Sequence, residues 1–440
     1  MIKKLIFIHL SLLLNVVVFG QSNTNSFYSK YHFGELNLSG NIQNATLGNT
    51  GIANDGWFNI NLKNPAGYAN LKLTSFQTSF KVGSVWMKDN SQSSFGNTST
   101  ITNISFGIPL AKWTAISFGI TPYSTVGYKY TSTYDDDNFG SVQIDAAGNG
   151  GISKLFLGNA YKINIDSNTF VNIGANANYL FGQTLHEAII YASLEDAFNS
   201  WYSKTINYND FTFDAGMQIH KKIKYNKRIK VNDTTFRYQP DSIQLVLGAV
   251  YSFNNTINTT YTEFIRSFRT SVGYISYVDT SKYVEDAQTT TMLPKQIGVG
   301  IGLHKLDKWM IQADVNYFEV GSYATTSGVP YRLKHTLQFG FGTEWIPDNS
   351  ISSSYFKKIK YRLGAYYAPS ILEVNNEQIT DMGITFGMGL PLKKTLSRIN
   401  FGIVYGMRGT VNNNLIQENY LNIIFGVSIN DKWFKKYKYN

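Results

Sequence analysis

The chain has 440 residues and no cysteine, which excludes a disulfide framework and a thiolate metal site. Charged residues make up only 15% of it, against roughly 25% in an average soluble domain, and aromatic residues also reach 15%. The net charge of +10 does not by itself indicate nucleic-acid binding, because the N-terminal segment predicts export away from cytoplasmic nucleic acid.

Residues 1–20 have the pattern of a secretory signal peptide. Lys3 and Lys4 precede an apolar run from Leu5 to Phe19, and Gly20 is a small residue at the expected cleavage site. An N-terminal membrane anchor is the alternative, but the run is short for a spanning helix of roughly 20 residues. With no cysteine after it, a lipid-anchored lipoprotein is excluded.

Residues 21–70 are rich in Gly and Asn and lack a strand pattern. They contain the stretch from Gly48 to Gly56 and end on Asn64-Pro65-Ala66-Gly67, directly before the first predicted strand. We therefore expect this segment to lie outside the wall of the main sheet.

From Leu71 onward the dominant pattern has a period of two, as in a strand whose alternate side chains point to opposite faces. An example is Leu421, Ile423, Phe425, Val427 and Ile429, which alternate with Asn422, Ile424, Gly426, Ser428 and Asn430. The second face is small or polar, unlike the Lys-, Glu- and Thr-rich outer face of a soluble sandwich. No later apolar run is long enough for a spanning helix. A closed sheet with lipid outside and a semi-polar lumen fits this pattern.

The alternation predicts 14 antiparallel strands. Asn254-Asn255 resembles a turn and would give 15 strands, but an extra reversal there would put the short turns Ala111-Lys112 and Leu306-Lys308 on opposite sides. We therefore keep 242–268 as one strand, since single-chain barrels favour even numbers. The predicted strands are 71–87, 101–110, 113–130, 151–163, 169–182, 204–222, 242–268, 294–305, 309–321, 331–345, 359–368, 379–391, 398–408 and 419–430.

The longer connections, at 128–150, 183–203, 269–293 and 369–378, then fall on the outer side. Basic residues gather on the periplasmic side, where they either contact anionic phospholipid headgroups, at about 1 kcal/mol each, or are solvated turn residues. They are Lys221, Lys222, Lys224, Lys227, Arg228 and Lys230, then Lys357, Lys358 and Lys360, and then Lys432, Lys435, Lys436 and Lys438.

One segment departs from the strand pattern. In His186–Trp201, the residues Ile190, Leu194, Phe198 and Trp201 recur at helical spacing. This predicts a short amphipathic helix in an external loop, whose apolar side covers either the barrel mouth or only its neighbouring loops.

Several motifs in order along the chain resemble the FadL/TodX family of outer-membrane transporters for hydrophobic compounds, in detail the subgroup of diderm bacteria with type IX secretion. The motifs are Gly48–Gly56, Asn64-Pro65-Ala66-Gly67, Gly119–Ser124 with Gly127-Tyr128, Leu293-Pro294 with Gly298, Gly300, Trp309, Ala313 and Asp314, Tyr361–Tyr367, Gly387–Leu392, and Asn430–Phe434. The resemblance implies an all-β, 14-stranded antiparallel transmembrane β-barrel with an N-terminal hatch in the lumen. Residues 1–20 are then the signal peptide, 21–70 the hatch with its motif Asn64, Pro65, Ala66 and Gly67, and 71–440 the barrel.

The resemblance also implies passive uptake of hydrophobic small molecules, of the long-chain fatty acid or aromatic hydrocarbon class, with sideways release at the third strand. Pro122 lies inside that strand, where it cannot donate to the ladder, and Gly119 and Gly127 flank it. The alternative is an ordinary bulge without a gate. Ile190, Leu194, Phe198 and Trp201 would form a lid over the outer ligand groove.

Nothing in the sequence predicts catalysis, a metal site or a cofactor. The six histidines show no metal-ligand spacing, and Gly298, Gly300 and Gly302 alternate along a strand, where they would admit the hatch close to the wall. We expect a monomeric, non-enzymatic barrel in the outer membrane that contacts its lipids and a hydrophobic ligand, but no nucleic acid. The alternatives are a partner or shuttle in type IX secretion, which would bring contacts with its components, and a porin-like barrel.

Overall fold

The structure is a computed structural model, and it describes residues 24–37, 40–194, 197–230, 236–253, 256–271, 274–321, 331–350, 352–393 and 395–433. The predicted signal peptide, residues 1–20, and the basic tail, residues 435–440, lie outside these ranges. No helix among the described residues is long and apolar enough to cross a membrane.

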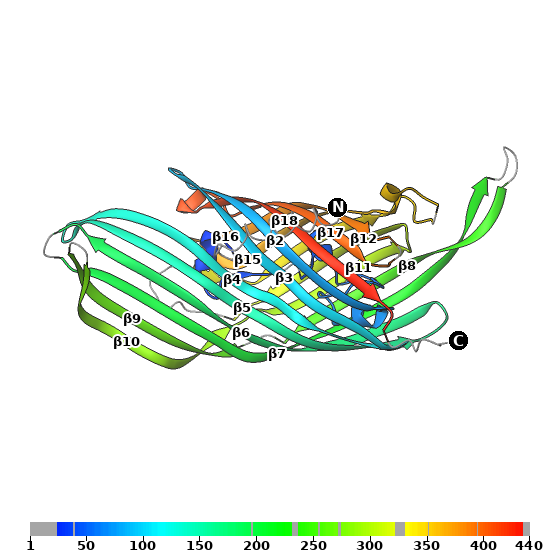
Figure 1. The fold of residues 1–440 in the computed structure, drawn as a ribbon, viewed down its shortest axis with the longest axis horizontal. Helices are drawn as coiled ribbons and strands as arrows, with labels where there is room; N and C mark the ends of the chain where they lie inside the picture. Colours follow the sequence, from blue (N-terminus) through cyan, green and yellow to red (C-terminus); the bar gives the residue numbers. More distant parts are fainter. Residues whose placement is uncertain are drawn as a thin grey trace, which may run out of the picture.

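The wall of the molecule is one antiparallel sheet that closes on itself (Figure 1). The last strand pairs with the first from Gln417↔Lys88 to Asp431↔Thr74. The strands are β2 (Thr74–Lys88), β3 (Ser93–Ala111), β4 (Thr114–Asp136), β5 (Gly140–Asn164), β6 (Thr169–Ala192), β7 (Asn199–Lys230), β8 (Phe236–Ser252), β9 (Thr256–Ser271), β10 (Tyr274–Met292), β11 (Lys295–Lys305), β12 (Trp309–Glu319), β13 (Tyr331–Leu333), β14 (Thr336–Trp345), β15 (Lys360–Val374), β16 (Glu377–Pro391), β17 (Arg398–Arg408) and β18 (Gln417–Asp431).

Three pairs of these segments count as single barrel strands, which leaves 14 and confirms the predicted fold. β8 and β9 both run antiparallel along β7, so they have the same direction and count as one strand, although residues 254 and 255 between them lie outside the described residues. The next strand is also made of two segments. β10 pairs with β9 and β11 pairs with β8, so β10 and β11 together form one barrel strand. The short β13 precedes β14, and both pair with β15.

The strands on the extracellular side run farther than the period-two pattern indicated. Most of the predicted loop 128–150 is strand, because β4 and β5 stay paired to Asp136↔Gly140, and β9 and β10 likewise occupy much of 269–293. Paired strands keep their backbone hydrogen bonds in water as well as in lipid, so the ladder continues past the membrane. The apolar alternation that marks a strand in the sequence ends where lipid contact ends.

The predicted helix at His186–Trp201 is wrong. β6 continues to Ala192 and β7 starts at Asn199, with His186 paired to Lys204 on one side and to Gly148 on the other. A lone short helix is marginal in water, whereas two flanking strands satisfy both backbone edges of this segment. The backbone hydrogen bonds to β5 and β7 therefore stabilise the strand more than the helical spacing of four apolar residues favours a helix.

Side chains on the outer wall form an apolar belt. On β11, Ile297, Val299, Ile301 and Leu303 are each more than a third exposed, while the glycines between them face inward. Trp113 stacks on Tyr161, and Trp345 lies beside Tyr361, at the end where the chain makes its short turns. An apolar belt bounded by aromatic residues is the surface that an outer-membrane barrel presents to lipid. The chain is therefore an outer-membrane protein.

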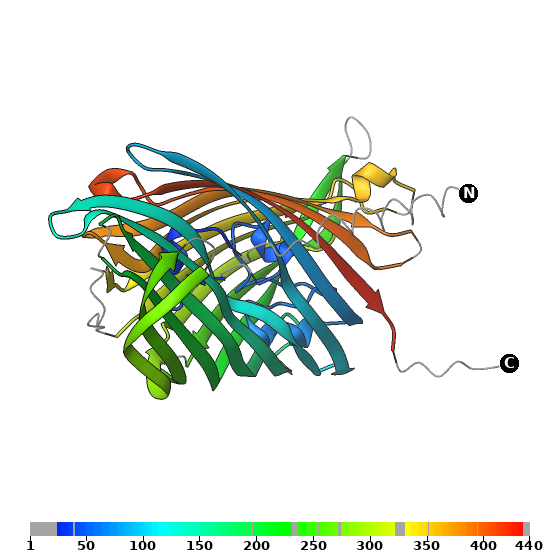
Figure 2. The same ribbon diagram turned by 60° about the vertical axis from the view of Figure 1, so that its left-hand side comes forward.

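The segment before β2 lies inside the barrel (Figure 2). This hatch contains η1 (Phe27–Lys30), β1 (Glu35–Leu36), α2 (Ile42–Ala45) and η2 (Pro65–Asn70), while η3 (Tyr355–Lys358) and η4 (Asn412–Asn414) belong to barrel connections. Asn64 caps η2 by accepting a hydrogen bond from the Ala66 amide, at 3.0 Å. Its amide group also donates to the Ile52 carbonyl at 2.9 Å and to the Met217 carbonyl of the wall at 3.2 Å.

Glycines on the inner wall let the hatch approach closely. A Cβ on Gly298 would lie 2.6 Å from the Ile52 side chain, and one on Gly300 would lie 2.9 Å from it. The structure thus confirms that the alternating glycines of this strand admit the hatch. Gly174 meets Pro65 in the same way, with 2.6 Å between a Cβ there and the Pro65 carbonyl carbon.

Candidate functional site: a seam in the barrel wall

The wall opens between β3 and β4. These strands pair only from Ala111↔Thr114 to Ile104↔Ile120. Beyond that point β3 pairs with β2 and β4 pairs with β5, but β3 and β4 do not pair with each other up to their extracellular ends. We call this open part, residues 93–103 of β3 and 121–136 of β4, the seam.

The hatch takes the place of β3 along the free edge of β4. Strand β1 pairs antiparallel with it, at Glu35↔Thr125 and Leu36↔Ser124. The Asn37 amide donates to the Tyr123 carbonyl at 2.9 Å, and the Ser124 hydroxyl donates to the Phe33 carbonyl at 2.8 Å. A wall strand that lacks its neighbour would leave buried backbone groups unpaired, and these contacts satisfy them.

The contact between hatch and β4 is tight at one glycine. Gly34 has φ of +93°, and a Cβ there would lie 2.4 Å from the Thr125 carbonyl oxygen. Only glycine adopts this conformation without strain, and only glycine fits this space. On the opposite rim, the Asn25 side chain fills the position that a Cβ on Gly96 would occupy. Hatch residues therefore reach both rims of the seam.

The three residues predicted for a gate all lie on β4, the third barrel strand. Gly119 stands next to the last pair with β3, and a Cβ on it would lie 2.3 Å from the Ile104 carbonyl oxygen. At Pro122 the register with β5 shifts, so the strand bulges where the seam begins. Gly127 accepts from the Ser26 amide at 3.0 Å, and its own amide donates to the Ser29 hydroxyl at 3.0 Å.

Behind the seam lies a cavity of about 190 Å³. Thr100 and Thr102 of β3, and Pro122 and Thr125 of β4, line its seam side. Its other walls are largely apolar and come from the hatch and from barrel strands, among them Phe33, Leu36, Ile42, Ile371, Leu372 and Ile379. A cavity with apolar walls and a charged side thus adjoins a stretch where two neighbouring wall strands are not paired with each other.

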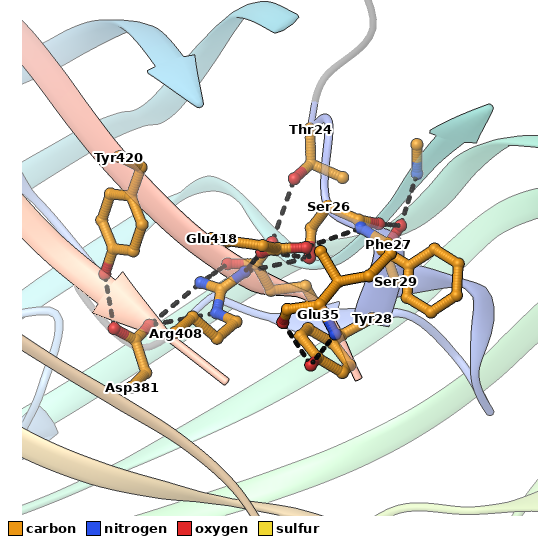
Figure 3. A network of polar contacts seen from close by, with 12 residues as sticks. Thr24, Ser26, Phe27, Tyr28, Ser29, Glu35, Asp381, Arg408, Glu418 and Tyr420 are labelled. Atoms are coloured by element: carbon orange, nitrogen blue, oxygen red, sulfur yellow. Dashed lines mark hydrogen bonds and ion pairs between the residues drawn. The ribbon is translucent and has the colours of Figure 1, made fainter. Parts of the chain in front are cut away.

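A buried ion network closes one side of this cavity and holds the hatch (Figure 3). Arg408 of β17 contacts Glu35 of β1, Asp381 of β16 at 3.0 Å and Glu418 of β18 at 3.4 Å. Glu418 also accepts from the Phe27 amide, at 2.7 Å. The hatch strand that covers the seam is therefore tied by charge to the wall strands β16, β17 and β18.

The network is short of positive charge. Arg408 contacts three carboxylates. Lys81 is a second cation near Glu35 and Asp381, but among the described residues it forms no ion pair within 4.0 Å. Two of the carboxylates also accept hydrogen bonds that stabilise their negative charge. Thr24 donates to Glu35 at 3.0 Å, and Tyr420 donates to Asp381 at 2.6 Å. Hydrogen bonds of this kind are what buried charges require in place of water.

The four residues predicted as a lid are not on one helical face. Ile190 lies in β6, paired with Ser200, and Trp201 lies in β7, where its ring packs 4.9 Å from that of Phe264. Leu194 and Phe198 flank the hairpin turn and are about half exposed. Their role as a lid stays a prediction.

Sequence reasoning missed the residues that close the seam. Gly34 and Glu35 carried no motif of their own, Ser124 was noted only as the end of the motif Gly119–Ser124, and the hatch was not expected to add a strand to the wall. Arg408 offered the one usable sign, because a charged residue stood on the inward face of a predicted membrane strand.

Comparison with protein-family models shows to which family the chain belongs. The model of one family, BamG, matches residues 1–440, the whole chain. The chain belongs to the BamG family. No curated protein matches the sequence of this BamG-family chain.

Solved barrels resemble the BamG-family chain in fold. The toluene transporter TodX of Pseudomonas putida aligns with a TM-score of 0.54 at 15% identity, over 90% of this chain and 99% of TodX. The toluene transporter TbuX of Ralstonia pickettii gives 0.52 at 14% identity, over 90% and 99%. A FadL homologue of Pseudomonas aeruginosa gives 0.52 at 10% identity, over the same shares. At these identities the likeness establishes the FadL-type fold.

Proposed function

We propose that the chain is a passive outer-membrane channel for hydrophobic small molecules, which leave sideways into the bilayer through the seam. The observation that carries the proposal is the separation of β3 from β4 beyond Ile104↔Ile120, with the hatch in place of the missing neighbour. Only two residue pairs between β1 and β4 and a few further hydrogen bonds close this gap. Opening it therefore costs far less free energy than separating two continuously paired wall strands.

The cavity behind the seam favours small ligands within this class. An apolar cavity of roughly 150 Å³ is enough to bind benzene. The cavity here, at about 190 Å³, accommodates one aromatic ring or a short stretch of alkyl chain. We therefore expect monoaromatic hydrocarbons to fit better than extended fatty acids, in keeping with the two toluene transporters that share the fold.

The hatch argues against a water-filled pore. Its backbone lies against glycines of β6, β11 and other wall strands, so it fills the lumen where the wall allows closest approach. An apolar solute gains roughly 0.8 kcal/mol per buried methylene along an apolar route, whereas a hydrated solute gains nothing there. This difference in free energy would make the channel selective for apolar solutes over hydrated ones.

Uptake across a lipopolysaccharide-containing outer membrane tests the proposal. Cells that express the chain should accumulate labelled toluene several-fold faster than cells without it, and their permeability to sugars should not change. A lipopolysaccharide leaflet is needed because plain phospholipid bilayers already admit aromatic hydrocarbons. Equal toluene uptake in both cells would contradict the proposal, and faster sugar entry would indicate a porin.

The alternative from the sequence, a partner or shuttle in type IX secretion, stays a prediction. Deletion of the gene separates it from uptake. Loss of surface protein secretion with unchanged toluene entry would favour the alternative, while the reverse result would favour the channel.

A further inference from the structure

A two-stranded ribbon leaves the barrel at its periplasmic end. β7 runs past its last partner in β6, Thr169↔Lys221, and β8 runs past its last partner in β11, Gln244↔His304. Beyond these points β7 and β8 pair only with each other, out to Lys230↔Phe236 (Figure 1). At about 3.3 Å per residue the ribbon projects roughly 25 Å from the barrel.

Within the described residues, neither outer edge of the ribbon pairs with a further strand. The last wall contact of β7 is the Lys222 amide, which donates to the Asn168 carbonyl at 2.7 Å. From Ile223 on, no backbone pairing to another strand is seen along this edge in the described part of the chain. Natural sheets usually protect such edges, since a row of free N–H and C=O groups is a template for another strand. On β8 the edge carries Pro240, but the β7 edge has no proline.

The ribbon holds much of the chain's excess charge. Residues 221–244 contain seven basic and two acidic residues, a net charge of +5 out of +10 for the whole chain. One of the acids, Asp241, is already bonded: Lys305 donates to it at 2.6 Å and lowers its pKa to about 2. Lys222 and Lys224 are exposed, and no ion pair of either is seen within the described residues.

The basic side chains at the root of the ribbon include a pair that points under the barrel, which favours a protein partner over lipid. Gln218 and His220 face the lumen, where Gln218 donates to the Ile52 carbonyl of the hatch at 2.8 Å. Lys222 and Lys224 continue the same face by strand alternation, so at the root of the ribbon they point under the barrel and away from the lipid belt. The face on the lipid side carries Ile223 and Tyr225, with Lys221 and Lys227 on the same face.

A basic hollow adjoins the root of the ribbon. It has a volume of about 610 Å³, and its lining includes Gln244 of β8 together with Lys72, Lys112, Lys162 and Lys432. An anionic chain that follows the ribbon towards the barrel would remain in a positive field. A second copy of this chain would be repelled, because it would bring the same positive charge.

We propose that the β7 edge of this ribbon, from Ile223 to Lys227, is a docking strand for an acidic, extended segment of a periplasmic protein. The segment would add a third strand to the ribbon through backbone hydrogen bonds. Its carboxylates would lie against Lys222, Lys224 and the hollow. Backbone pairing would supply affinity, and charge would select an acidic strand over neutral or basic ones.

A peptide-binding measurement tests the proposal with the full-length protein in phosphatidylcholine nanodiscs. The probe is a labelled peptide of four Glu-Val repeats, and one control peptide has alternate backbone amides methylated so that it cannot pair. We expect the probe to bind and the methylated peptide to bind at least ten-fold more weakly. Equal binding of the two would overturn the strand-addition proposal.

Protein variants locate the site. Lys222→Glu with Lys224→Glu should weaken probe binding at least ten-fold. Replacement of residues 223–243 by Asn-Gly, which joins the register partners Lys222 and Gln244, should abolish it. Lys357→Glu with Lys393→Glu, two exposed lysines of other turns at the same end, should leave it within two-fold of wild type.

Two results would refute the proposal outright. One is unchanged probe binding by the shortened protein, with barrel folding verified by heat-modifiable gel mobility. The other is ribbon-dependent binding to phosphatidylglycerol vesicles without any binding of the probe, which would assign the basic residues to lipid headgroups.

Discussion

Arg408 is the single cation in direct contact with three carboxylates that come from the hatch and from two wall strands. Removal of one partner of a buried ion network leaves uncompensated charge, and such losses typically cost about 3–5 kcal/mol. The Arg408 side chain is only 13% exposed, so solvent offers little compensation. The residue therefore ties the position of β1, and with it the closure of the seam, to the wall strands β16, β17 and β18.

Arg408→Met should loosen the hatch while the barrel stays closed. Glu35, Asp381 and Glu418 would repel each other, so we expect faster proteolysis of the hatch and a lower unfolding temperature. Adding Glu418→Gln should restore part of the loss, because it removes one of the three negative charges. Unchanged proteolysis and melting in the single variant would mean that the network does not hold the hatch.

Gly34→Ala tests the contact between the hatch and β4. The new methyl group would lie 2.4 Å from the Thr125 carbonyl oxygen, on a backbone with φ of +93°. Strain of this kind costs roughly 1–3 kcal/mol, so amides of residues 33–37 and 123–127 should exchange hydrogen about ten-fold faster. Gly56→Ala is the matched control, since a Cβ there stays 3.3 Å from its neighbours. Equal exchange in both variants would show that the hatch strand does not pack as described.

Among the elements, the sequence predicted what lipid contact determines. The apolar alternation of strands such as β11 and β18 follows directly from having lipid on one face, and it placed every barrel strand in its position along the chain. The short turns after β3 and β11 followed from the same pattern. The joined segments β8 and β9 could be assigned to one strand because two turns had to lie on the same side.

The elements that the sequence did not predict depend on pairing between distant segments. The extensions of β4, β5, β6 and β7 into the external medium have neither face in lipid, so they lack the alternation and were read as loops or as a helix. The seam is a break in register between β3 and β4, and no local pattern marks where two strands part. That β1 would occupy the gap depends on contacts between Glu35 and Arg408, 373 residues apart.

At the scale of the whole molecule, three parts have separate roles. An apolar belt with aromatic borders fixes the barrel in the outer membrane, a hatch packed against inner glycines blocks the lumen, and a basic ribbon extends from the periplasmic end. Along the seam β3 and β4 are not paired, and the hatch covers the gap. In the proposed function, passage of an apolar solute from lumen to lipid would require the hatch strand to move away from β4.

A reversible lock on the seam tests this claim most directly. The chain has no cysteine, so Leu36→Cys with Ser124→Cys would create one disulfide between register partners of β1 and β4. Ser84→Cys with Leu421→Cys places a control disulfide between β2 and β18, where the wall is continuous. The account predicts that toluene uptake falls several-fold in the oxidised seam variant, recovers on reduction, and stays unchanged in the control. Full uptake through the oxidised seam would contradict sideways release between β3 and β4.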